Sequence, residues 1–238
     1  MRRRLYLMRH AEVSYFDEGG RPLSATRAPL TELGREQARA AGRALRDVRL
    51  DRVITSGLPR TLETARLVVA ELEAPPTQPI EEWPDLQELR GGRLSDIADD
   101  RLEDAFLSAF RGVAPRDATF LGGESVGSLL DRVLPALERL CANSWDTALA
   151  VLHGGVNRAI LSWALAGEPT FFGHLEQSPA CINIIDAGPD WVVRAVNVTP
   201  EDPAHLGPRS TTIEQLLEQH RPYRRARQAP GHGGRSGG

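Results

Sequence analysis

Arginine and histidine side chains lie at the ends of three apolar runs in the chain. The set comprises Arg9 and His10, Arg60, and His153. Guanidinium groups pair with phosphate oxygens two at a time and stay protonated at any relevant pH. A neutral imidazole can attack phosphorus, and a second can donate a hydrogen bond to a nonbridging oxygen as charge develops there. If folding brings them together, these residue types indicate a phosphate-binding site capable of phosphoryl transfer.

A leaving alkoxide also needs a proton, and two glutamates are candidate donors. Glu12 follows His10 by two residues, and Glu88 lies in the segment Leu86–Gly92. A carboxyl group beside a bound phosphate dianion keeps its proton to higher pH, which general acid catalysis near neutrality requires. Residue types alone do not choose between Glu12 and Glu88.

The elements that must position these residues alternate between strands and helices. Short apolar runs predict buried strands, and helical spacing of apolar residues predicts a helix after each. We expect strands at residues 4–8, 52–56 and 147–152, and helices from the N-cap Thr31 to residue 48, from 58 to 72 and from 156 to 166. This alternation is typical of an α/β fold, a three-layer αβα sandwich with a mostly parallel sheet. Ligands bind at the carboxyl ends of the strands in such sheets, where helix N-termini add amide donors.

The remaining segments are expected to complete one domain at residues 1–220. We expect a helix at 95–111, a helix after Gly122–Ser125 that is kinked at Pro135, and a closing pair of strands at 180–186 and 191–198. Residues 221–238 are rich in arginine and glycine, so we expect a disordered tail there. We expect four further histidines to be solvated: His174, His205, His220 and His232.

The composition excludes several kinds of site. All 29 basic residues among the 238 are arginine, so a Schiff-base lysine, a lysine general base and a Walker lysine are absent. The formal net charge is −3, but five arginines lie in the acid-free tail, leaving 24 arginines against 32 acids in residues 1–220. A body this acidic is a poor nucleic-acid binder, so we expect no nucleic-acid partner and a small phosphorylated substrate held by a local cluster.

The cysteines and the first residues indicate a compartment. Cys141 and Cys181 lie in apolar patterns typical of reduced core residues. The apolar run at residues 5–8 is too short for a signal sequence or a membrane span. We therefore expect a cytoplasmic protein with no membrane partner. The oligomeric state stays open, with a homodimer as one option.

Five ordered blocks between residues 5 and about 198 carry a family resemblance. They are Leu7–Glu12, Leu30–Ala38, Ser56–Ala65, Gly123–Ser125 and His153–Arg158. Together they resemble the histidine phosphatase superfamily, in its phosphoglycerate mutase-like branch. The resemblance implies the phosphoglycerate mutase-like αβα fold, with residues 1–220 as its catalytic domain. Five blocks in order are far more specific than a single Arg-His pair.

The resemblance also implies roles for individual residues. His10 would be the phosphorylated nucleophile, Glu88 the proton donor, and His153 the second catalytic histidine. Arg9 and Arg60, with Gly154 beside His153, would bind the substrate phosphate. Water would then attack the phosphohistidine, with Glu88 acting as base. The family's chemistry uses no metal, so no metal site and no cofactor are expected.

Two positions depart from the family pattern. Ala11 lies where the family usually has glycine, and Phe16 falls where many members have an asparagine that contacts the phosphate. An alanine in place of glycine at position 11 should destabilise the fold little unless the backbone there needs a positive φ. Phe16, beside Tyr15, predicts a more apolar mouth, and with Phe106, Phe110 and Phe120 it favours a larger or less polar leaving group than glycerate.

These observations favour a metal-independent phosphomonoesterase of the histidine acid phosphatase type, acting on a small phosphorylated metabolite. One alternative is a cofactor-dependent phosphoglycerate mutase. The chain lacks both the long insert after the acid glutamate and the lysine shared by the classical mutases. Another alternative is a non-catalytic module that binds a phosphorylated ligand, but such a module would not need the nucleophile His10.

Overall fold

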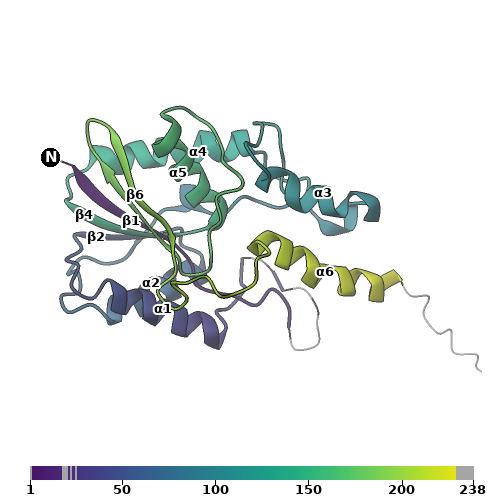
Figure 1. Cartoon of the computed structure of the whole chain (residues 1–238), viewed down its shortest axis with the longest axis horizontal. Coiled ribbons are helices and arrows are strands. Elements are labelled where there is room, and N and C mark those ends of the chain that lie inside the picture. The colour runs from purple at the N-terminus through teal and green to yellow at the C-terminus, as the bar shows by residue number, and fades with distance from the viewer. Residues whose placement is uncertain (1, 18–20, 22, 25, 229–238) are drawn as a thin grey trace, which may run out of the picture.

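A six-stranded sheet forms the centre of the molecule, described from a computed structural model that covers residues 2–17, 21, 23–24 and 26–228 (Figure 1). Its strands are β1 (Arg3–Arg9), β2 (Arg52–Thr55), β3 (Glu81–Glu82), β4 (Thr147–Leu152), β5 (Ile182–Ala187) and β6 (Trp191–Val198). They lie side by side in the order β3-β2-β4-β1-β5-β6. The apolar runs that predicted strands therefore form β1, β2 and β4, which are neighbours at the middle of the sheet.

The sheet is mixed, which corrects the expectation of a mostly parallel sheet. β3, β2, β4 and β1 pair in parallel, whereas β5 is antiparallel to both β1 and β6. The pairing of β5 with β1 joins segments far apart in the chain, whereas the connection between β5 and β6 is only three residues long. Parallel neighbours need a crossover of a dozen or more residues, so a turn this short can only join antiparallel strands. The expected closing pair of strands is confirmed.

Helices cover both faces of the sheet, which confirms the three-layer αβα arrangement (Figure 1). Helices α1 (Glu32–Ala44) and α2 (Pro59–Ala70) lie on one face, and α4 (Val126–Ala142) and α5 (Gly154–Ala166) lie on the other. A separate apolar core fills each interface, with Met8 and Val53 under the first pair and Leu129 and Ile160 in the second. None of the described helices is long and apolar enough to cross a membrane.

Local capping chemistry explains where the helices begin. The hydroxyl of Thr31 accepts a hydrogen bond from the Gly34 backbone N–H at 2.9 Å, which confirms Thr31 as the N-cap of α1. Ser125 caps α4 in the same way through the N–H of Ser128, at 3.1 Å. Helix α4 continues through Pro135 to Ala142. These starts depend on neighbours along the chain, so the sequence could specify them.

The expected helix at 95–111 is wrong in extent. Only α3 (Leu102–Leu107) is α-helical, and three-residue 3₁₀ turns cover Leu94–Asp96, Asp99–Arg101 and Ser108–Phe110. The segment divides because its apolar residues serve different cores. Leu102 and Phe106 pack with Leu217 of the last helix, whereas Phe110 packs toward the α4–α5 core.

The last helix, α6 (Thr212–Gln228), crosses the boundary expected at residue 221, which corrects where the tail begins. Leu217 and His220 are buried, and Arg221 pairs with Glu103 at 3.3 Å and with Glu218 at 3.2 Å. The ring of Tyr223, past this boundary, lies 6.4 Å from that of Phe16 between centroids, so a tertiary contact continues beyond the point where the composition changes. Residues 229–238, the rest of the expected tail, lie outside the described residues.

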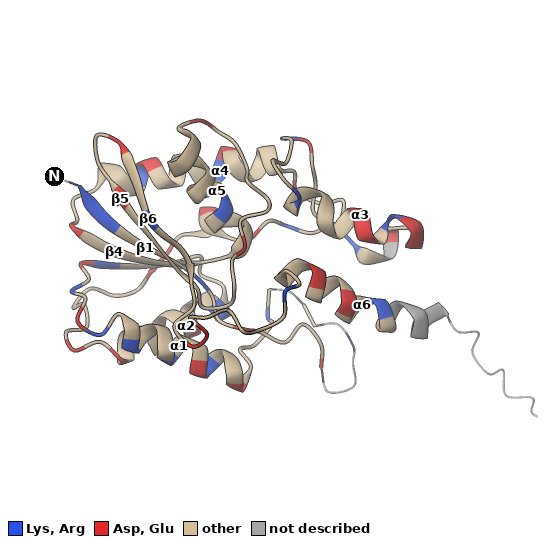
Figure 2. Cartoon of the chain, in the orientation of Figure 1, with Lys and Arg blue, Asp and Glu red and all other residues tan. Residues whose placement is uncertain are grey.

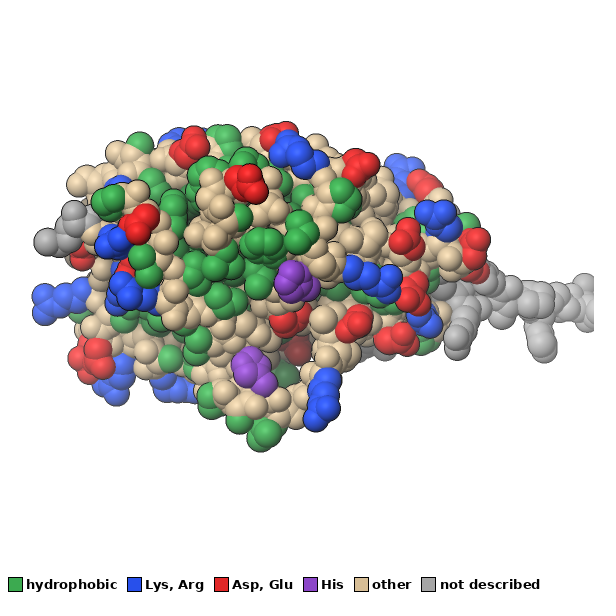
Figure 3. All heavy atoms as spheres, turned by 45° about the horizontal axis from the view of Figure 1, so that its top comes forward, with side chains coloured by type: hydrophobic (Ala, Val, Ile, Leu, Met, Phe, Trp, Pro, Cys, Tyr) green, Lys and Arg blue, Asp and Glu red, His purple; other side chains and the backbone are tan. Residues whose placement is uncertain are grey.

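The expectation that four histidines are solvated is wrong for His220, which packs against Phe16 and Phe106 with ring centroids 4.8 and 5.3 Å away. His174 and His205 are exposed, and Figure 3 shows two histidine side chains on the surface of the face that it presents. His232 lies outside the described residues.

Charged and thiol side chains follow the expected partition between surface and core. Acidic and basic side chains are interspersed along α1, where Arg39 pairs with Glu36 one turn away, whereas the acidic residues of α6 all precede Arg221 (Figure 2). Both cysteines are free thiols. Cys181 is buried, and burial raises the pKa of its thiol to about 12, whereas Cys141 is only partly buried.

Gly34 generates a stability prediction, because α1 packs closely on the segment that follows β1. A Cβ atom at Gly34 would lie 2.2 Å from the carbonyl oxygen of Glu12. We expect Gly34→Ala to lower the free energy of unfolding by about 1–3 kcal/mol, measured by urea denaturation, because backbone would have to move. Gly207→Ala is the control, since the nearest atom to a Cβ there is 3.5 Å away. Equal effects of the two substitutions would contradict the prediction.

Candidate active site

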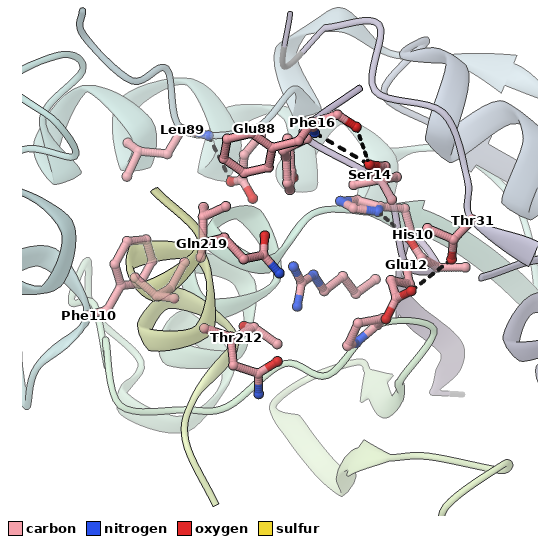
Figure 4. Close-up of a pocket in the computed structure, with 18 of the residues that line it drawn as sticks. His10, Glu12, Ser14, Phe16, Thr31, Glu88, Leu89, Phe110, Thr212 and Gln219 are labelled. Carbon is pink, nitrogen blue, oxygen red and sulfur yellow. Dashed lines mark hydrogen bonds between the residues drawn. The ribbon is translucent and has the colours of Figure 1, made fainter. Parts of the chain in front are cut away.

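The residues singled out in the sequence meet around one pocket at the carboxyl ends of β1, β2 and β4. A cavity of about 360 Å³ opens there, and its lining includes Arg9, His10, Glu12 and Glu88 (Figure 4). Arg60 and His153 are buried and are not among its described lining residues. In the parallel register of β1 and β4, Arg9 lies opposite Leu152, so His10 and His153 leave their strands side by side. Their ring centroids are 5.2 Å apart.

His10 is held in a single tautomer. Its side chain is 3% exposed, and Nδ1 lies 2.8 Å from the carbonyl oxygen of Ala11. A carbonyl oxygen can only accept, so Nδ1 has the proton and Nε2 keeps its lone pair. Burial, and then the positive charges of Arg60 and Arg9, hold the pKa of His10 well below 6.5. The ring is therefore neutral at neutral pH and has one nitrogen available for attack.

His153 is fully buried between Arg60 and Ser56. Its Nδ1 lies 3.3 Å from Nη2 of Arg60, and its Nε2 lies 2.7 Å from Oγ of Ser56. Arginine can only donate, so Nδ1 accepts and Nε2–H donates to the serine hydroxyl. Burial, followed by the charge of Arg60, lowers the pKa of His153 well below 6.5. Both imidazole rings in the site are thus neutral.

Positive charge in the site comes from buried guanidinium groups. Arg9 donates to the carbonyl oxygen of Gln177, while its buried Nε has no hydrogen-bond partner among the described residues. Arg60, at the start of α2, is 4% exposed, and burial lowers its pKa without removing its charge. Such desolvated donors, held in place before a ligand arrives, suit an anion with several oxygen acceptors.

Gly154 lies at the first turn of α5, beside the side chains of Arg9 and Arg158. A Cβ there would be 3.0 Å from Nη1 of Arg158 and 3.6 Å from Nε of Arg9. Arg158 was not singled out from the sequence, although it is buried, donates to the carbonyl oxygen of Gly173 at 3.0 Å, and has a pKa lowered by burial to about 10. Its place one turn after Gly154 was the available signal, but only packing shows which way it faces.

Glu88 reaches the same pocket by capping α5. Its carboxylate accepts from the N–H of Gly155 at 3.1 and 3.2 Å, and from the N–H of Leu89 at 2.8 Å. A Cβ at Gly155 would lie 2.5 Å from Oε1 of Glu88, so the glycine permits this close approach. The amide at this helix start therefore binds a protein carboxylate, whereas the sequence suggested a role toward phosphate.

Arg132, which the sequence analysis also missed, holds the Glu88 segment from α4. It donates to the carbonyl oxygens of Asp85 at 2.8 Å, Gln87 at 2.6 Å and Glu88 at 3.1 Å. Glu124 pairs with Arg132 at 2.8 Å, and this ion pair holds the Arg132 guanidinium group in position. No local pattern distinguishes such an arginine from one on a solvated helix face.

The second candidate acid, Glu12, lines the pocket but is tied to α1. Its Oε1 accepts from the hydroxyl of Thr31 at 2.8 Å, and its backbone N–H donates to Gln37 at 3.0 Å. The structure thus brings both glutamates to one pocket and gives them different surroundings. Among the described residues, only backbone amides donate to the Glu88 carboxylate, whereas Glu12 links the loop after β1 to the first turn of α1 (Figure 4).

The two departures from the family pattern have different outcomes. Ala11 is fully buried and has no positive φ, so an alanine fits there, as expected. Phe16 lines the pocket with Tyr15, and its ring packs edge-on against His220 of α6. The apolar mouth predicted from Phe16 is therefore present, and it includes Phe110 and Phe120.

Known proteins share both the sequence pattern and the fold. The family model of the histidine phosphatase superfamily (branch 1) matches residues 5–199. An Arabidopsis thaliana protein named "Probable 2-carboxy-D-arabinitol-1-phosphatase" is 26% identical over 210 residues, or 84% of this chain and 43% of that protein. An adenosylcobalamin/alpha-ribazole phosphatase of Salmonella typhimurium is 31% identical over 77% of this chain and 90% of its own length. The crystal structure of the alpha-ribazole phosphatase of Shigella flexneri superposes with a TM-score of 0.62 at 26% identity, covering 82% of this chain and 96% of that one.

The buried neutral histidines generate a prediction for stability against pH. Because burial holds the pKa values of His10, His153 and His220 below 6.5, the unfolded chain binds protons that the folded chain does not as the pH falls through this value. We expect the free energy of unfolding to decrease between about pH 7.5 and 5.5, by up to about 1.4 kcal/mol per pH unit for each histidine. Lowered carboxylate pKa values, such as that of Asp186 at about 2, contribute only at lower pH.

Urea denaturation across this pH window checks the prediction. His10→Asn should flatten the pH dependence, whereas His174→Asn, at an exposed histidine, should leave it as in the wild type. A His10→Asn variant with the wild-type slope would contradict the assignment of a buried neutral ring.

Proposed function

The chain belongs to the histidine phosphatase superfamily (branch 1), and we propose that it is a phosphomonoesterase that hydrolyses a small phosphorylated metabolite through a phosphohistidine at His10. One observation supports this most directly. His10 is neutral, its Nδ1–H is bound to the carbonyl oxygen of Ala11, and it lines a pocket together with Arg9, while the charges of Arg60 and Arg9 are close enough to lower its pKa. That is the state a nucleophilic imidazole needs before it meets phosphorus.

In the first step, Nε2 of His10 attacks phosphorus and the bond between phosphorus and the ester oxygen breaks. Glu88, in its protonated form, gives its proton to the leaving alkoxide, because an unprotonated alkoxide is a poor leaving group. In the second step, water attacks phosphorus, Glu88 accepts a proton from it, and the P–N bond breaks. His10 and inorganic phosphate are then free, and Glu88 is ready for the next cycle.

Arg9 and Arg60 would pair with the phosphoryl oxygens and offset their charge during both steps. In the free protein, Arg60 donates to Nδ1 of His153. A bound phosphoryl group competes for the Arg60 guanidinium, and His153 can then take up a proton and donate to a phosphoryl oxygen. Because guanidinium groups supply the positive charge, we propose that the reaction needs no metal ion.

His10→Ala tests the nucleophile. We expect the wild-type protein to hydrolyse nitrophenyl phosphate with no added metal and at the same rate in excess chelator. We expect His10→Ala to lower kcat by roughly 1,000-fold or more, as is typical when a nucleophile is removed. His174→Ala, at an exposed histidine, is the matched control. Activity retained in His10→Ala would contradict the mechanism, and phosphate binding without turnover in the wild type would favour a non-catalytic binding module.

Glu88→Gln tests the proton donor. Nitrophenolate leaves readily without a proton, whereas an alkoxide does not, so we expect the substitution to slow alkyl phosphates at least about tenfold more than nitrophenyl phosphate. The measurement is kcat for both substrates with each protein. Glu12→Gln is the comparison, because Glu12 lines the same pocket. An equal loss on both substrates in Glu88→Gln, with the selective loss in Glu12→Gln, would transfer the acid role to Glu12.

A further inference from the structure

Helix α6 forms the wall of the pocket opposite the catalytic histidines, and we infer that it selects an uncharged leaving group with an apolar, ring-sized face and hydrogen-bonding groups. The inference rests on the proposed phosphatase function and assigns its substrate class. Helix α6 begins at Thr212, beyond residue 199 where the family match ends. The wall is therefore a feature of this chain outside the segment that defines the family.

One face of α6 is directed toward the pocket. Its lining residues lie at helical spacing and include Thr212, Gln215, Leu216 and Gln219. In Figure 4 the amide of Gln219 extends from α6 toward the centre of the pocket, on the side away from Glu12. The hydroxyl oxygen of Thr212 is buried and has no hydrogen-bond partner among the described residues. The wall thus offers a ligand an uncharged donor and acceptor in the amide of Gln219.

Tertiary contacts hold α6 in this position. The buried Leu217 packs with Leu102 and Phe106 of α3, and the backbone N–H of Thr212 donates to Glu176 at 3.2 Å. On the side of the loop after β1, His220 packs against Phe16. Contacts from three parts of the chain fix the distance between α6 and His10, so the wall can discriminate between leaving groups.

The charges in the pocket disfavour an anionic leaving group. Among the described lining residues, only Arg9, Glu12 and Glu88 are charged. In Figure 4, Glu12 lies beside His10 and Thr31, and Glu88 lies near Leu89 and Phe16. A carboxylate on the leaving group would lose its water next to two acidic side chains without gaining a cation, because Arg9 would already bind the phosphoryl group. Burying an unpaired charge in this way is strongly unfavourable.

Aromatic side chains complete the wall. Phe110 and Phe120 both line the pocket, and their rings meet nearly edge to face with centroids 5.6 Å apart. Together with Leu216 they present an apolar surface to the leaving group, next to the amides of α6. An uncharged alcohol with a flat ring and polar substituents, such as a nucleoside, matches this combination.

Two matched substrate pairs test the inference. Glycerol 3-phosphate has a neutral hydroxymethyl group at the position where 3-phosphoglycerate has a carboxylate. A nucleoside 5′-monophosphate and ribose 5-phosphate differ by the flat base. We expect kcat/KM to favour the neutral member of the first pair and the ring-bearing member of the second, each by at least about tenfold, which corresponds to about 1.4 kcal/mol. Where a compound is hydrolysed too slowly for kcat/KM to be measured, its inhibition constant for nitrophenyl phosphate hydrolysis is compared with that of its pair member.

Gln219→Lys tests the role of α6 directly. A cation on the wall should improve kcat/KM for 3-phosphoglycerate relative to glycerol 3-phosphate by about tenfold or more. Glu218→Gln is the control, because it changes the charge of α6 by the same amount at a residue outside the pocket lining. Both side chains are exposed, so neither substitution should disturb folding, which urea denaturation checks.

The outcomes separate this inference from the proposed function. A wild-type preference for 3-phosphoglycerate, or equal shifts in Gln219→Lys and Glu218→Gln, would overturn the inference while nitrophenyl phosphate is still hydrolysed through His10. Loss of the phosphatase proposal itself would appear as nitrophenyl phosphate hydrolysis that is absent or independent of His10.

Discussion

Two imidazole rings lie buried, 5.2 Å apart between centroids, among guanidinium groups, and the rest of the site depends on their being neutral. A charged ring there would lose its hydration and also meet the repulsion of Arg9 and Arg60. The fold satisfies each neutral ring separately. His10 donates to its neighbouring carbonyl group, and His153 bridges Arg60 and Ser56. Neutrality thus prepares one ring for attack and leaves the positive charge to the arginines, which keep it at any relevant pH.

Glycines at the start of α5 let Glu88 and two arginines lie close to the backbone at that end of the helix. At Gly154 the backbone lies beside Arg9 and Arg158, and at Gly155 it lies against the Glu88 carboxylate. Glu88 comes from a segment outside the parallel strands and depends on Arg132 of α4 for its place. A helix N-terminus that could bind an anion is therefore used to hold a protein carboxylate next to the reacting group.

The phosphate end and the leaving-group end of the pocket come from different parts of the chain. Strand ends and helix starts within the family match provide the histidines and arginines, whereas α6 lies beyond it. Phe16 connects the two parts, because it lines the pocket and packs on His220 of α6. Under the proposed function, a fixed set of phosphoryl-binding groups with a separately built wall would allow one mechanism to act on different alcohols.

The sequence by itself determined the features that depend on near neighbours. Apolar runs specified β1, β2 and β4, the hydroxyls of Thr31 and Ser125 specified helix starts, and the strand ends placed His10, Arg60 and His153 at one edge. Tertiary structure alone decided the antiparallel position of β5, the division of the segment around α3, and the course of α6 past residue 221. It also decided the roles of Arg132, Arg158 and His220. Each of these depends on contacts between residues far apart in the chain, and an arginine that clamps a buried loop has the same local pattern as one on a solvated helix face.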